Sequence, residues 1–105
     1  MQRVLLLLLF PILLPAQDSL HLTATATWAD PTLPSSAGVR YNDIWGYTDD
    51  AGREYAILGT VGATLFFDLA DPANPTEVAR IPGQLNSIWR DYKTYGHYAY
   101  MAADQ

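Results

Sequence analysis

Apolar and polar residues alternate along several short stretches of this chain, which is the pattern of β-strands. The first clear case predicts a strand over residues 21–28. Its alternate positions are apolar, and three of the positions between them are threonine; the apolar ones are Leu22, Ala24, Ala26 and Trp28. Residues 29–38 are rich in proline, serine and glycine, so they are predicted to form a loop.

Six further strands are predicted at close spacing along the rest of the chain. They cover residues 43–47, 54–60, 64–69, 76–81, 87–92 and 97–103. Turns are expected at Asp49–Gly52 and Val61–Ala63, and a loop bounded by prolines is expected at 71–75. Because these connections are short, neighbouring strands should be antiparallel, and the first four should form one meander of the size of a propeller blade.

The pattern then starts again. The tetrad Asn-x-Ile-Trp occurs at residues 42–45 and at residues 86–89, a shift of 44, and glycine follows at the same distance as Gly52 and Gly96. Periods of about 40–45 residues with four strands are typical of propellers. The predicted fold is therefore all-β, with about one and a half antiparallel propeller-like blades. Since repeat folds normally need about three units, the isolated chain should be marginally stable and prone to aggregate through its strand edges.

The N-terminus has the pattern of a secretory signal. A short positive start that ends at Arg3 precedes an almost purely apolar run at residues 4–14, which is too short to span a bilayer. Cleavage is expected after Ala16; the alternative is an uncleaved anchor or a buried helix. The chain should thus be secreted or held at the cell surface, with no transmembrane segment after cleavage of its signal helix.

This division gives four segments. Residues 1–16 form the signal peptide, 17–40 an N-terminal strand and linker, 41–84 the first β-repeat and 85–105 a truncated second one. Without residues 1–16 the chain keeps five basic and eleven acidic side chains, a net charge of −6. Such a surface repels phosphate backbones, so nucleic acid is not an expected partner. No cysteine occurs, which excludes disulfides, cysteine metal sites and a lipid-modified cysteine.

The acidic residues suggest a metal site at first sight. Asp49, Asp50 and Glu54 surround a glycine, but their spacing does not match a calcium loop, and a hairpin turn is favoured. Asp68 and Asp71 are expected to fold their loop by accepting backbone N–H bonds. The only histidines, His21 and His97, lack ligands at zinc spacing. No catalytic motif, cofactor or metal is therefore predicted.

Aromatic residues give the remaining candidates. Trp45, Tyr47, Trp89 and Tyr92 could line a ligand-binding face, but the recurrence of the tryptophans at the repeat period favours core packing between blades. The segment 90–95 departs from the first repeat and carries both charge and tyrosine. It is the candidate contact for an unknown surface protein or glycan, through Arg90, Tyr92, Lys93 and Tyr95.

The chain also resembles the choice-of-anchor B family. The resemblance extends from Trp28 to Gln105 and is carried by four runs, Tyr41–Tyr47, Gly52–Ala56, Phe67–Pro75 and Ser87–Lys93. Leu65–Asp68 lies where the family has the end of its LVIVD element. The resemblance implies an exported bacterial protein of β-propeller repeats that is attached to the surface by a C-terminal anchor, and it implies no catalytic residues.

These patterns allow three interpretations. The favoured one is the N-terminal fragment of a non-enzymatic surface propeller that serves as a binding or adhesion scaffold. The alternative is a secreted propeller enzyme, a hydrolase whose active residues lie beyond Gln105, since a propeller fold does not fix function. The third is the whole product of a broken gene.

Overall fold

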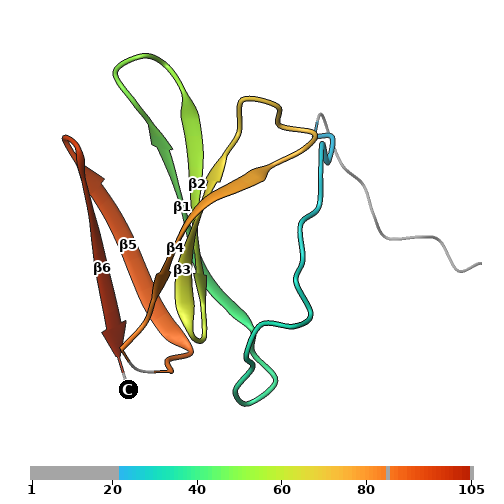
Figure 1. Ribbon diagram of the computed structural model, residues 1–105, viewed down its shortest axis with the longest axis vertical. Coiled ribbons are helices and arrows are strands. Elements are labelled where there is room, and N and C mark those ends of the chain that lie inside the picture. The colour runs from blue at the N-terminus through green and yellow to red at the C-terminus, as the bar shows by residue number, and fades with distance from the viewer. Residues whose placement is uncertain (1–21, 85, 105) are drawn as a thin grey trace, which may run out of the picture.

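The computed structural model describes residues 22–84 and 86–104, which form two antiparallel sheets (Figure 1). The first sheet is a meander in the order β1-β2-β3-β4, and the second is a hairpin of β5 and β6. The strands are β1 (Tyr41–Thr48), β2 (Glu54–Thr60), β3 (Ala63–Asp68), β4 (Thr76–Pro82), β5 (Trp89–Tyr95) and β6 (Tyr98–Asp104). The described part of the chain contains no helix that could cross a membrane.

These strands confirm the all-β, antiparallel prediction, and each of the six lies within a few residues of its expected position. The expected signal peptide, residues 1–16, lies outside the described residues. The strand expected at 21–28 is wrong for the residues described, because 22–30 belong to no strand. Alternation places side chains on two faces of an extended segment, but a strand also needs a neighbouring strand to pair with. None of the described strands pairs with this segment.

The two central strands of the first sheet have apolar side chains on both faces. Ile57 and Phe66 are register partners and point to one face, whereas Leu65 and Phe67 point to the other. Ile57, Leu65 and Phe67 are all buried. A sheet that is apolar on both faces must be covered on both sides, and it therefore lies between two other parts of the chain.

The N-terminal segment covers one face. Leu33, Ala63, Leu65 and Phe67 form a buried cluster on this side. The indole of Trp28 packs edge-on against the Phe67 ring at a centroid distance of 4.7 Å, and the Asp30 backbone N–H donates to the Tyr41 hydroxyl at 2.7 Å. Trp28 therefore contributes to the fold as a core side chain rather than as part of a strand.

The β5–β6 hairpin covers the other face, with β5 lying along β1. Three hydrogen bonds join these parts of the chain: the Tyr92 N–H donates to Asp43 Oδ2, the Trp45 Nε1–H donates to Thr94 Oγ1, and the Tyr47 hydroxyl donates to the Gly96 carbonyl. Each bond joins residues 49 positions apart, so β1 and β5 run in the same direction, face to face.

The hairpin comes close to the first sheet at Gly59. A Cβ atom at this position would clash with Oδ1 of Asn42, and it would lie 2.8 Å from Cε2 and from the hydroxyl oxygen of Tyr92. Tyr92 is fully buried over this glycine, and its hydroxyl is 2.8 Å from Thr64 Oγ1. A side chain at residue 59 would therefore clash both with Asn42 of the first sheet and with Tyr92 of the hairpin.

We expect Gly59→Ala to destabilise the fold by about 1–3 kcal/mol, the usual cost of overpacking a close-packed interior. Gly46→Ala is the matched control, because it is also a strand glycine and a Cβ there would meet nothing within 4 Å. Its effect should stay within about 0.5 kcal/mol, as for ordinary surface changes. Urea unfolding followed by tryptophan fluorescence measures both, and equal effects would contradict the proposed role of Gly59.

Candidate binding cleft

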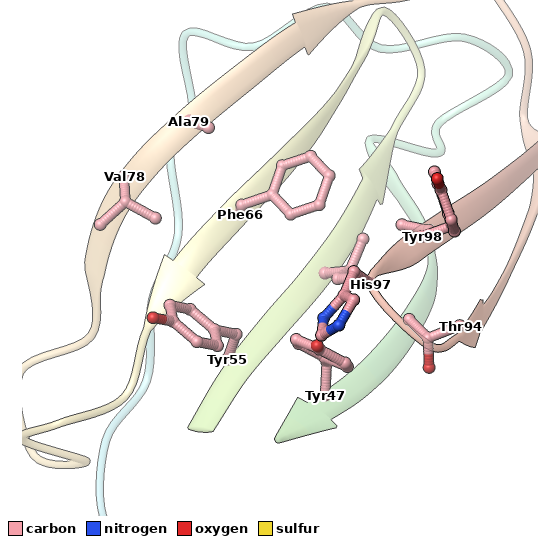
Figure 2. Close-up of a pocket in the computed structure, with 10 residues that line it drawn as sticks. Tyr47, Tyr55, Phe66, Val78, Ala79, Thr94, His97 and Tyr98 are labelled. Atoms are coloured by element: carbon pink, nitrogen blue, oxygen red, sulfur yellow. The ribbon is translucent and has the colours of Figure 1, made fainter. Parts of the chain in front are cut away.

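An open cleft of about 290 Å³ separates the first sheet from the hairpin (Figure 2). The hairpin is two strands wide and the sheet is four, and the backbone of β5 lies along β1 and β2 of that sheet. The sides of the cleft come from both sheets. They are Tyr47, Tyr55, Ile57, Phe66, Val78 and Ala79 from the first sheet and Thr94, His97, Tyr98 and Ala99 from the hairpin.

The walls of the cleft are apolar and aromatic. Tyr47 and Tyr55 stack with their centroids 6.3 Å apart and their planes inclined by 29°. Figure 2 shows His97 and Tyr98 on the opposite, hairpin side. Tyr55, Phe66 and Tyr98 were not among the candidate residues from the sequence, although each lies in a predicted strand. Alternation assigns such residues to a face of their own strand, but it does not show which other strands they face.

Several polar atoms at the margin of the cleft have partners within the chain. The Tyr47 hydroxyl donates to the Gly96 carbonyl at 3.4 Å, and Thr94 Oγ1 accepts from the Trp45 indole at 3.1 Å. His97 Nε2 lies 3.7 Å from Asp50 Oδ2, at the point where the turns of the two sheets meet. The arrangement therefore suits apolar or aromatic groups and offers little to an ion.

Two of the four residues expected to contact a partner point towards the first sheet. Arg90 is half-buried, and its guanidinium donates to the carbonyls of Thr60 and Val61 at 2.8 and 3.0 Å. Tyr92 is buried over Gly59. Both side chains thus fix the hairpin to the sheet.

Lys93 and Tyr95 are the exposed members of these four residues. The Lys93 ammonium lies 4.3 Å from the centroid of the Trp45 ring and donates to Asp91 Oδ1 at 2.9 Å. The hydrogen bond and charge of Lys93 lower the pKa of Asp91 below its usual range. Tyr95 is 80% exposed. Contact with a partner through these two side chains stays a prediction.

The two tryptophans of the repeated tetrad lie in different surroundings. Trp45 is half-buried between the sheets, where its ring contacts Lys93 and its N–H contacts Thr94. Trp89 is 64% exposed and lines an open hollow together with Asn42 and Asp43 of β1. The expected core packing therefore describes Trp45 but not Trp89 in the part of the chain that the structure describes.

The acidic residues of the turns build those turns. Asp49 Oδ1 accepts the backbone N–H groups of Ala51 and Arg53, both at 2.9 Å, and the bonds with Arg53 are the main reason that the pKa of Asp49 is lowered. Asp68 accepts the backbone N–H of Ala70 at 2.7 Å. These contacts confirm the turn interpretation.

Asp71 has the same role in the loop between β3 and β4. It accepts the Asn74 side-chain amide at 2.7 Å and the Ala73 backbone N–H at 3.0 Å, and both bonds lower its pKa. Within residues 22–84 and 86–104, no three His, Asp or Glu side chains gather in a way that could hold a metal ion. The turn carboxylates are therefore understood as loop-forming groups.

Comparison with known proteins gives no relative. No protein-family model, no curated protein and no solved structure matches this chain.

Burial raises the pKa of Tyr92 above its ordinary value, and this predicts an alkaline loss of stability. The unfolded chain releases the phenolic proton near pH 10, while the folded chain retains it. The contribution of Tyr92 to the free energy of unfolding is therefore complete below about pH 10 and is lost as the pH rises further. Tyr92→Phe cannot show this loss. It should cost about 1–2 kcal/mol at neutral pH, because Thr64 loses its partner.

The measurement is chemical unfolding of both proteins between neutral pH and about pH 11, which brackets the usual tyrosine pKa. The parent chain should have a higher free energy of unfolding than Tyr92→Phe at neutral pH, and this difference should become smaller as the pH rises. The other tyrosines are common to both chains and cancel in the difference. Parallel stability curves over the whole range would contradict the assignment.

Proposed function

We propose that this chain is the N-terminal part of an exported bacterial surface protein whose propeller-like β-repeats serve as a non-enzymatic binding or adhesion scaffold. The first repeat is residues 41–84, and the second starts at residue 85. The proposal rests on the resemblance to the choice-of-anchor B family, on the apolar leader and on the way that the second sheet stacks on the first.

The observation that carries the proposal is the parallel stacking of β5 on β1. Face-to-face sheets whose first strands run in the same direction are what successive units of a propeller require, since each unit buries its faces on its neighbours. The constant separation of 49 residues along three hydrogen bonds supports such an arrangement. A binding role is favoured by the exposed side chains of Lys93 and Tyr95.

Export predicts a defined N-terminus. Expressed in a Gram-negative host, the chain should appear in the periplasm and begin at Gln17, as intact mass spectrometry would show, because cleavage is expected after Ala16. Leu7→Arg interrupts the apolar run and should leave the precursor uncleaved in the cytoplasm. Recovery of an unprocessed parent chain from the cytoplasm would count against export.

The scaffold proposal also predicts the content of the gene beyond the codon for Gln105. The open reading frame should continue with further units of about 44 residues that contain the Asn-x-Ile-Trp tetrad, and it should end in a C-terminal anchoring segment. Sequencing the locus tests this. A stop codon directly after Gln105 would contradict the proposal, and clusters of inward-facing Asp, Glu or His in later units would favour the hydrolase instead.

A further inference from the structure

Residues 22–28 have the pattern of a strand but no strand partner in the described chain. Apolar residues alternate with three threonines from Leu22 to Trp28, and threonine favours strands. No backbone–backbone hydrogen bond links residues 22–29 to the rest of the described chain. Such a segment can be added as a strand to the edge of another sheet, which satisfies its backbone groups.

The segment and the residues that follow it run along the outer face of the first sheet, the face away from the hairpin (Figure 1). Trp28 packs on Phe67, near the end of β3. Six residues later, Pro34 lies beside Gly62, which immediately precedes β3. The chain therefore runs opposite to β3 here. Since β4 pairs antiparallel with β3, the segment has the same direction as β4.

The segment covers only part of the outer face. Beside Trp28 lies an open hollow of about 390 Å³, and its apolar lining includes Ile44 of β1 and Leu58 of β2. Ile44 is 63% exposed. An open apolar surface and a segment without strand partners are therefore next to each other, and one added sheet would cover the surface and pair with the segment.

The sequence repeat indicates what lies on this face. With the shift of 44, Gly46 and Thr48 of β1 correspond to Arg90 and Tyr92 of β5. Arg90 and Tyr92 both form hydrogen bonds with the first sheet, whereas Gly46 and Thr48 are both exposed on the outer face. Because each unit of a repeat fold packs on its neighbours in the same way, the outer face is the surface that receives another repeat.

We propose that the last β-repeat of the complete protein packs on the outer face of the first sheet, and that residues 22–28 join its sheet as a strand. This inference rests on the proposed function, since it needs repeats beyond Gln105. The segment has the direction of β4, and it precedes the first Asn-x-Ile-Trp tetrad as β4 precedes the second. It therefore takes the place in the last repeat that β4 has in the first, and the repeats close into a ring.

Trp28 fixes the orientation of the added strand. Its indole points to the first sheet, against Phe67. In a strand, alternate side chains share a face, so Leu22, Ala24 and Ala26 point the same way as Trp28. The apolar side of the strand is then turned towards the outer face of the first sheet, and the three threonines point away from it.

Amide hydrogen exchange tests the inference on two proteins, the product of the complete gene and residues 17–105 alone. In the complete product, alternate amides of residues 23–28 should exchange at least about a hundredfold more slowly than in residues 17–105, because a paired amide exchanges only when its strand opens. Free exchange in a product with further repeats would overturn the inference and leave the proposed function in place. A gene that ends at Gln105 would contradict both.

A second copy of the chain is the other possible cover of this face. Slow exchange of the same amides in residues 17–105, at high protein concentration only, would assign the outer face to a second copy and would overturn the inference.

A substitution tests the packing on the outer face separately. Ile44→Lys should lower the melting temperature of the complete product by at least about 4 °C, since it buries an unpaired charge, but should change that of residues 17–105 by less than about 1 °C. Ala51→Lys adds the same charge in an exposed turn and is the matched control, without effect in either protein. An equal loss in both proteins with Ile44→Lys, or none in the complete product, would overturn the inference. Should this variant not fold, the exchange of the unchanged protein decides.

Discussion

The contact between the Tyr92 ring and the backbone of Gly59 determines how the two sheets are arranged. A missing side chain on β2 leaves a space, and a large ring from β5 fills it. The phenol would be costly to bury without a partner, and Thr64 supplies one. With this ring in place, the neighbouring residues of β5 come within reach of β1, so that Asp43 and Trp45 can form their hydrogen bonds.

The same contact explains why part of the charged segment 90–95 lies between the hairpin and the first sheet. Arg90 lies two residues before Tyr92 and on the same face, and it reaches the Thr60 and Val61 carbonyls at the turn between β2 and β3. The linker joins at this turn as well, because the Gly83 and Ser87 N–H groups donate to the carbonyls of Gly62 and Val61. Several short-range interactions therefore converge on one turn, and together they position the hairpin against the first sheet.

The local pattern of the sequence was sufficient to predict the positions of the six observed strands, but it did not show which strands lie next to each other. The strand at 54–60 was predicted with its observed bounds, and the acidic turns were predicted as turns, because alternation and turn chemistry are local properties. The packing of Tyr92 over Gly59 could not be predicted, because it depends on how β5 stacks on the first sheet. The β1–β5 hydrogen bonds join residues 49 positions apart, whereas the sequence repeat has a shift of 44. The strand expected at 21–28 failed for the same reason: its pattern was correct for a strand, but no neighbouring strand lies beside it. The cleft depends on which strands stack on each other. The sequence therefore indicated some of the aromatic residues, but not the cleft that they line.

The hydrogen bonds that join β1 to β5 have a mechanical consequence. They extend from Asp43 to Tyr47 along β1 and over the second half of β5, so this line is the fixed side of the joint between the two sheets. The backbones of β4 and β6, on the opposite side, are not in contact. A rotation about this line acts through a lever arm of three strand spacings, roughly 14 Å. Turning the hairpin by about 10° would displace β4 relative to it by roughly 2.5 Å, half the distance between paired strands. Small angular changes at the Tyr92 contact are thus amplified into large changes in the width of the cleft.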